Sequence, residues 1–267
     1  MKNLFGASAP VRYEGGVLSE RRWRPETVPY LVVGMFFSLC CGYLVVAVVS
    51  SFFENASQNQ QRLLVLGGNL IFVHGALLAM ISVFLKVNQL SWAEAFGWKN
   101  GSPLRVLALS VGTVAILLPV TWTLSKYSGL LIERSGGVAE SQLAVQYLQQ
   151  QPPWLELIGL GLMTIVVAPV VEEALFRGIL YPTIKQAGFP RAALYGTSLL
   201  FAVYHSNLMT MVPLFVLALA LVVAYEATDN LWTPTLIHAF FNAANFLVLT
   251  CQWNLDPYFE WLRALVP

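Results

Sequence analysis

Charged side chains are rare in this chain, and two acids and a base stand close together inside one long apolar stretch, as Glu172, Glu173 and Arg177. A charged side chain at the centre of a membrane-inserted helix costs about 2.5–3.5 kcal/mol. We therefore expect these groups to be paired, hydrated or close to a membrane surface. A carboxylate in a partly dry cavity can also take up and return a proton, which is the chemistry of a general base.

Helical geometry assigns different surroundings to the two acids. Glu173 and Arg177 are four residues apart and so share a helix face, whereas Glu172 is turned by about 100° from Glu173. We expect Glu173 to pair with Arg177 and Glu172 to face a cavity formed by other helices. The alternative is an ion-paired helix end near the membrane surface with only a structural role. Pro169, three residues before Glu172, predicts a bend there, with or without a functional purpose.

Further polar residues interrupt two other apolar stretches. His205 ends one, while His238 and Asn242 lie four residues apart in another and so project from one helix face. A single histidine in an apolar helix is more often structural, and only the convergence of His205 with the other groups favours a catalytic role. His74 has no polar partner at helical spacing, so we interpret it as structural. Asn245 either extends the polar face of Asn242 or binds a neighbouring helix.

The composition shows which solvent surrounds these groups. The chain has 267 residues, of which 57% are hydrophobic and 11% charged, and its mean hydropathy is +0.65. These values exclude an ordinary water-soluble globule and predict an all-α, polytopic membrane helical bundle with about seven to eight transmembrane helices, because lipid leaves open strand edges unsatisfied. The seven predicted spans are Tyr30–Phe53, Leu63–Leu85, Leu104–Leu124, Trp154–Thr183, Ala192–Tyr204, Met209–Tyr225 and Leu231–Thr250, and a short C-terminal helix would be the eighth.

Basic residues predict the orientation and the division of the chain. They concentrate before the first span and between the second and third, which places the N-terminus in the cytoplasm. We predict a cytoplasmic tail at residues 1–28 and one membrane domain at residues 29–267. The turn containing Tyr225, Glu226 and Asp229 looks solvated. The basic residues on the predicted cytoplasmic side are Lys2, Arg12, Arg21, Arg22, Arg24, Lys86, Lys99, Arg105, Lys185 and Arg191.

The polar residues also carry a resemblance to a known family. The order Glu-Glu-x-x-x-Arg, then Phe-x-x-x-His, then His-x-x-x-Asn, each on its own apolar segment, resembles the CAAX prenyl endopeptidase and bacteriocin-processing family of membrane proteases. The resemblance centres on a catalytic core at residues 154–248. It implies an intramembrane endopeptidase in which Glu172 and His205 activate a water molecule. It further implies that His238 and Asn242 hold the oxyanion and that Glu173 and Arg177 position the helix.

The resemblance leaves the cofactor open. A divalent metal such as zinc would find ligands in Glu172, His205 and His238, but the His-Glu-x-x-His spacing is absent, and we favour metal-independent activation of water by the glutamate.

The expected partners are the lipid bilayer and a membrane-associated peptide or protein, with no nucleic acid. Prenylated C-terminal motifs, leader peptides and membrane-anchored regulators are the open substrate classes, and the site is expected towards the cytoplasmic side. A proton-coupled transporter and an inactive scaffold of the same fold are the alternative functions.

Overall fold

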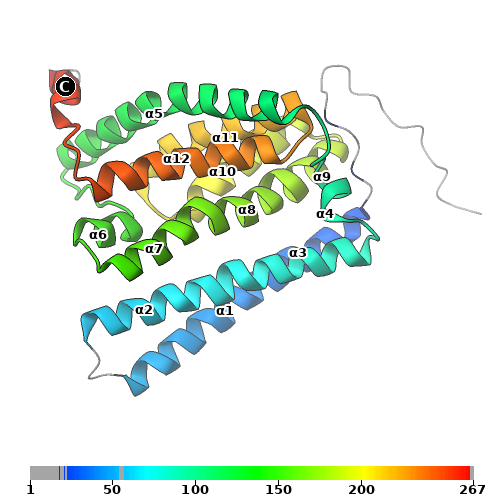
Figure 1. Cartoon of the computed structure of the whole chain (residues 1–267), viewed down its shortest axis with the longest axis horizontal. Helices are drawn as coiled ribbons and strands as arrows, with labels where there is room; N and C mark the ends of the chain where they lie inside the picture. The colour runs from blue at the N-terminus through cyan, green and yellow to red at the C-terminus, as the bar shows by residue number, and fades with distance from the viewer. Residues whose placement is uncertain (1–17, 19–20, 22, 54–56, 265–267) are drawn as a thin grey trace, which may run out of the picture.

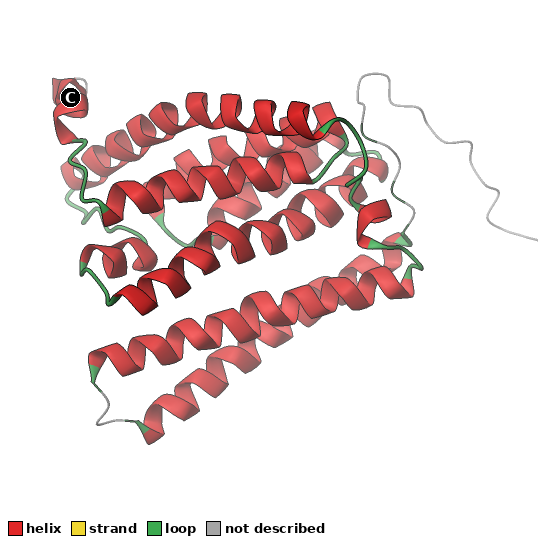
Figure 2. Ribbon diagram, viewed as in Figure 1, coloured by secondary structure: helices red, strands yellow, loops and turns green. Residues whose placement is uncertain are grey.

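A computed structural model of the chain describes residues 18, 21, 23–53 and 57–264. Within these residues all regular secondary structure is helical (Figure 2). The predicted all-α membrane bundle is therefore confirmed. Most of the predicted tail at residues 1–28, including Lys2, Arg12 and Arg22, lies outside the described residues.

The first part of the chain is a helical hairpin at one side of the molecule, coloured blue to cyan in Figure 1. Its first arm is α1 (Val28–Phe52), preceded by the short 3-10 turn η1 (Pro25–Thr27). Its second arm runs without a break through α2 (Gln58–Gly68), the π-helical segment η2 (Asn69–Gly75) and α3 (Ala76–Val87). The one-turn helix α4 (Trp92–Ala95), capped by Ser91 and Glu94, then leads to the rest of the chain.

The remaining helices form a bundle above the hairpin in Figure 1. A single continuous helix of this bundle contains both acids of interest and consists of α7, η3, α8, η4 and α9, in which η3 and η4 are π-helical. Helices α5, α10, α11 and α12 pack beside it. The bounds are α5 (Pro103–Arg134), α6 (Leu143–Gln149), α7 (Trp154–Leu162), η3 (Met163–Val167), α8 (Ala168–Glu173), η4 (Ala174–Leu180), α9 (Tyr181–Gln186), α10 (Pro190–Tyr204), α11 (Leu208–Thr228), α12 (Trp232–Thr250) and the 3-10 segment η5 (Asp256–Ala264).

Local sequence explains where the bundle helices begin. Ser102 caps the N-terminus of α5 by accepting a hydrogen bond from the backbone N–H of Arg105, and Asn207 caps α11 through Thr210 in the same way. Pro190 occupies the first turn of α10, where its missing N–H costs no hydrogen bond. Helix α5 extends ten residues beyond the predicted span end at Leu124, to Arg134, because the polar residues there remain compatible with a helix outside the hydrocarbon.

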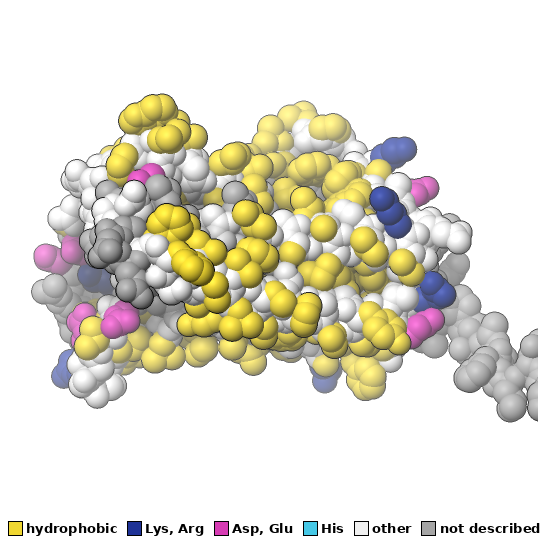
Figure 3. All heavy atoms as spheres, turned by 90° about the horizontal axis from the view of Figure 1, so that it is seen from below, with side chains coloured by type: hydrophobic (Ala, Val, Ile, Leu, Met, Phe, Trp, Pro, Cys, Tyr) yellow, Lys and Arg dark blue, Asp and Glu magenta, His cyan; other side chains and the backbone are white. Residues whose placement is uncertain are grey.

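Among the described residues, four helices are long and apolar enough to cross a membrane, at Pro25–Phe52, Pro103–Arg134, Trp154–Gln186 and Leu208–Thr228. The other predicted spans are helical as well. Helix α10 has only 15 residues and α12 has 19, and the apolar part of the hairpin's second arm is limited to Ile71–Val87. Large apolar side chains cover much of the outer surface, whereas most acidic and basic side chains lie towards the two ends (Figure 3). This distribution fits a bundle surrounded by lipid.

At the end of the molecule where α11 and α12 meet, the turn that we expected to be solvated is buried. The Arg21 guanidinium donates hydrogen bonds to the Tyr225 hydroxyl at 2.5 Å and to Asp229 Oδ1 at 2.6 Å. The side-chain amide of Asn100 also donates to Asp229. The prediction of a solvated turn was wrong for Tyr225 and Asp229, because residues distant in the sequence cover them.

Candidate active site

The two adjacent acids lie on α8, between two π-helical segments. Glu173 is fully buried and Glu172 is 8% exposed. A π-helical segment shifts the following residues around the helix axis, and such segments are frequent at functional sites. Pro169, where we predicted a bend, lies two residues after the end of the π-helical segment η3. The helix that carries the acids is therefore irregular on both sides of them.

Glu173 is the centre of a buried polar cluster. Its Oε1 accepts hydrogen bonds from Arg177 Nη1 and from His238 Nδ1, both at 2.9 Å. Arg177 also donates to the backbone carbonyl of Ala218 on α11 at 3.3 Å. The expected Glu173–Arg177 pair is thus confirmed, and it links three helices, α8–η4, α11 and α12.

Phe201 on α10 lies between the two histidines of the bundle. Its ring centroid is 4.8 Å from that of His205 and 5.6 Å from that of His238. The Arg177 guanidinium carbon lies 4.4 Å from the same ring, in cation–π geometry. Because one fully buried phenyl ring contacts all three groups, the motifs of α8–η4, α10 and α12 converge on one place.

The two histidines present different nitrogens to their surroundings. His205 Nδ1 donates to the backbone carbonyl of Phe201 at 2.8 Å, since a carbonyl oxygen only accepts. The neutral ring then carries its free lone pair on Nε2. His238 Nδ1 donates to the Glu173 carboxylate in the same manner, so its Nε2 donates a hydrogen bond only when the ring is an imidazolium.

Three imidazoles lie within electrostatic range of Glu172. Its carboxylate interacts electrostatically with His205 and His238 as well as with His74, whose Nε2 lies 3.9 Å from Glu172 Oε1. Glu172 Oε2 is buried and has no hydrogen-bond partner among the described residues. The two oxygens of this carboxylate are therefore in different environments.

Asn242 binds the helix that carries the acids, two turns before them. Its Nδ2 donates to the backbone carbonyl of Thr164 at 2.7 Å. In the π-helical pattern of η3 the N–H of Ala168 binds the Met163 carbonyl. The next donor in that pattern, for Thr164, would be Pro169, which has no N–H. Asn242 thus satisfies a carbonyl that the proline leaves open, and its second amide hydrogen remains for another acceptor.

The comparison with known families decides what this arrangement represents. Residues 153–244 match the family described as "Type II CAAX prenyl endopeptidase Rce1-like". The chain carries a type II CAAX prenyl endopeptidase domain. No curated protein and no solved structure is significantly similar to the chain. The family resemblance of the motifs is confirmed, and at the level of the family this is an integral membrane protein and a CAAX-type endopeptidase.

The endopeptidase domain contains all six residues that the sequence singled out, which are Glu172, Glu173, Arg177, His205, His238 and Asn242. It does not contain His74. Helical spacing could not reveal the contact between His74 and Glu172, because the two residues lie on different helices. Asn245 binds a neighbouring helix, which was the second of the two predicted alternatives. Its Oδ1 accepts a hydrogen bond from Trp122 Nε1 on α5 at 2.8 Å.

A metal ion at the endopeptidase site would require several convergent ligands. A catalytic zinc site has three protein ligands and an open position. Among the residues that the structure describes, no three His, Cys, Asp or Glu side chains converge closely enough to hold a metal ion. The donor set Glu172, His205 and His238 therefore does not fit a metal in this conformation, and no step below depends on one.

Proposed function

We propose that this protein is an intramembrane endopeptidase in which Glu172 and His205 activate a water molecule for attack on a peptide carbonyl. One observation carries the proposal: Glu172 Oε2 is a buried carboxylate oxygen without a hydrogen-bond partner among the described residues. Buried polar atoms are nearly always satisfied, and an exception at a conspicuous site is often completed by water or substrate.

His205 complements Glu172 because its Nδ1 is held by the Phe201 carbonyl. That bond fixes the ring orientation and leaves Nε2 as the acceptor, as expected of a histidine that helps to hold and deprotonate water. A water molecule that donates one hydrogen to Glu172 Oε2 and the other to His205 Nε2 keeps a lone pair free for attack on carbon.

His238 and Asn242 supply the donors for the oxyanion. In this role His238 is an imidazolium, which donates through Nδ1 to Glu173 and keeps the hydrogen on Nε2 for the oxyanion. Asn242 keeps one amide hydrogen beyond the one bound to Thr164. Fixed donors in a site without bulk water stabilise a developing negative charge strongly, typically by about 3–4 kcal/mol for each donor.

The complete reaction balances with these groups. The water oxygen forms a bond to the carbonyl carbon while its proton moves to Glu172, and the carbonyl oxygen becomes an oxyanion bound by His238 and Asn242. The carbon–nitrogen bond then breaks as Glu172 returns the proton to the leaving nitrogen. The products are a carboxylate and an amine, and no metal enters the scheme.

The substrate class follows from the family and the location of the site. The family description names prenylated CAAX substrates, and we propose a membrane-associated, prenylated peptide for this chain. Such a peptide reaches a buried site from the lipid. We further propose that the N-terminus and the accessible side of the site face the cytoplasm. The basic residues Lys86 and Lys185 lie in the last turns of α3 and α9, and Lys99 follows α4, all at the ends of helices expected on that side.

The test uses the purified full chain in detergent and a fluorescence-quenched peptide ending in a farnesylated cysteine motif. Glu172→Gln is expected to abolish cleavage while the protein remains folded, because the amide keeps the shape but cannot accept the proton. Glu226→Gln is the matched control, since Glu226 binds Tyr181 and Lys185 outside the site. Unchanged cleavage by Glu172→Gln would contradict the mechanism.

Two further measurements separate the remaining alternatives. Full activity in chelator-treated enzyme without bound metal supports water activation by Glu172, whereas activity that returns only with added metal contradicts it. If the wild-type protein cleaves none of the prenylated, leader or membrane-anchored peptides, a proton flux in liposomes that is lost in Glu172→Gln identifies a transporter. Absence of both activities identifies an inactive scaffold.

A further inference from the structure

The helical hairpin before the endopeptidase domain brings a third imidazole to the acid of the site. His74 belongs to η2, and its Nε2 lies 3.9 Å from Glu172 Oε1. Only 13% of the His74 side chain and 10% of the Glu172 side chain are exposed. We propose that His74 is a positioning residue for Glu172, so that the active site extends beyond the matched domain. This inference rests on the function proposed above.

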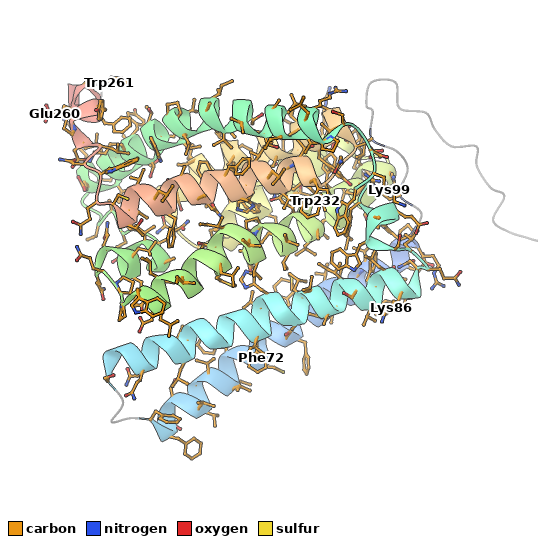
Figure 4. The ribbon with its side chains drawn as sticks, in the orientation of Figure 1. Phe72, Lys86, Lys99, Trp232, Glu260 and Trp261 are labelled. Carbon is orange, nitrogen blue, oxygen red and sulfur yellow. The ribbon has the colours of Figure 1, made fainter. Side chains whose placement is uncertain are left out.

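The position of His74 is set by tight packing inside the hairpin. Ser38 on α1 donates a hydrogen bond to the backbone carbonyl of Phe72 at 2.8 Å. Gly42 on α1 lies against the Phe72 side chain so closely that a Cβ there would overlap it. Figure 4 shows Phe72 on the arm of the hairpin that carries η2. The π-helical segment with His74 is thereby fastened to α1.

The hairpin is in turn anchored beside the acids. Leu77 and Ile81 on α3 are buried in the same hydrophobic cluster as Val171 and Leu175, which flank Glu172 along its own helix. These apolar residues begin about one turn after His74, so the second arm shares a buried core with the helix that carries the acids. His74 therefore faces Glu172 because the packing of α3 fixes the rotation of the second arm.

The contact distinguishes the two oxygens of the Glu172 carboxylate. His74 lies beside Oε1, whereas Oε2 has no hydrogen-bond partner among the described residues. At 3.9 Å the Nε2–Oε1 pair is longer than a direct hydrogen bond but within the range of an ion pair. With both side chains almost fully buried, the ring beside Oε1 restrains the rotation of the carboxylate. Oε2 is then the oxygen directed at the water.

Two other roles for His74 fit the structure less well. A metal ligand is not supported, because His74 forms no group of three metal-ligating side chains with other described residues. A purely structural role predicts that an apolar replacement lowers stability. A positioning role predicts that it also lowers turnover, and that an amide in place of the imidazole restores the turnover.

The activity test compares His74→Leu and His74→Gln with the wild type in the farnesylated peptide assay. His74→Leu is expected to lower kcat by roughly 10- to 100-fold with KM unchanged and a Tm about 3–5 °C lower, as for a group that contacts and orients a reacting side chain. His74→Gln places an amide nitrogen near the position of Nε2, and its kcat is expected to remain within about threefold of the wild type. Ile71→Ala, a 61% exposed residue of the same segment, is the matched control and should retain full activity.

A thermal double-mutant cycle tests the contact without any substrate. The Tm changes of His74→Leu and Glu172→Gln are expected to be non-additive by at least about 3 °C, because the residues interact directly. Additive changes would overturn the contact itself, whether or not the protein cleaves a peptide. Coupled changes that accompany an unaltered kcat in His74→Leu would overturn the positioning role.

The same experiments separate this inference from the proposed function. Unaltered cleavage by Glu172→Gln contradicts the proposed mechanism and with it any catalytic purpose for His74. An inactive Glu172→Gln beside a fully active His74→Leu contradicts only the role of His74. Equal losses of kcat in His74→Leu and His74→Gln, together with a lowered Tm in both, would show that His74 is structural.

Discussion

The hydrogen bond from Asn242 to the Thr164 carbonyl allows the structural and chemical roles of one side chain to be separated. Asn242→Ala removes the donor that Thr164 receives in place of the missing N–H of Pro169. An unsatisfied backbone carbonyl costs about 1–3 kcal/mol. At about 2–4 °C per kcal/mol, the Tm is expected to fall by roughly 5 °C. The loss of an oxyanion donor lowers kcat by about 10²- to 10³-fold.

Replacement of Pro169 supplies the missing donor from the backbone itself. In Pro169→Ala the new N–H is placed to bind the Thr164 carbonyl. In this background Asn242→Ala should therefore lower the free energy of unfolding by at least about 1 kcal/mol less than it does in the wild type. The loss of kcat should be the same in both backgrounds, since the backbone N–H points along the helix and not at the substrate. Thermal unfolding in detergent and steady-state peptide cleavage measure the two effects.

The control for this cycle is Asn245→Ala, on the same helix. It removes the hydrogen bond to Trp122, so a similar fall in Tm is expected with unchanged kcat. The reasoning is refuted if Asn242→Ala is equally destabilising with Pro169 and with Ala at that position. It is refuted on the chemical side if Asn242→Ala retains the wild-type kcat.

Two other substitutions test the packing around the site by thermal unfolding in detergent. Arg177→Met leaves the buried Glu173 carboxylate without its guanidinium and is expected to lower the free energy of unfolding by about 3–5 kcal/mol. The double variant with Glu173→Gln should recover part of this loss, and strictly additive losses would contradict the pairing. Gly178→Ala places a Cβ 2.6 Å from Phe96 Cε1 and should cost about 1–3 kcal/mol. Gly112→Ala, with open space around it, should cost nothing, and equal effects would contradict the close packing.

Periodicity within single helices predicted the parts of the site that depend on one helix. The four-residue spacing of Glu173 and Arg177 gave the observed ion pair, and the same spacing put His238 and Asn242 on one face of α12. The helical fold followed in the same way from apolar stretches of membrane-spanning length. These features need only the geometry of an isolated helix and the preference of apolar side chains for lipid.

Features that depend on contacts between distant elements were not predictable. His74 looked structural because its partner, Glu172, lies about a hundred residues further along the chain. Tyr225 and Asp229 looked solvated because Arg21, which covers them, comes from the opposite end of the sequence. The hydrogen bond between Asn242 and Thr164 depends on the π-helical pattern of η3, for which sequence periodicity gives no signal.

The ion pair between Glu173 and Arg177 also bears on how the protein enters the bilayer during synthesis. Both residues belong to one continuous helix, so each charge has its counterion before helices α10, α11 and α12 have arrived. Glu172 has no such partner within its helix, but the hairpin with His74 precedes it in the chain and is made first. His238 arrives last, on α12, and binds Glu173. The order of helices along the chain thus gives each acid a polar neighbour as it leaves water.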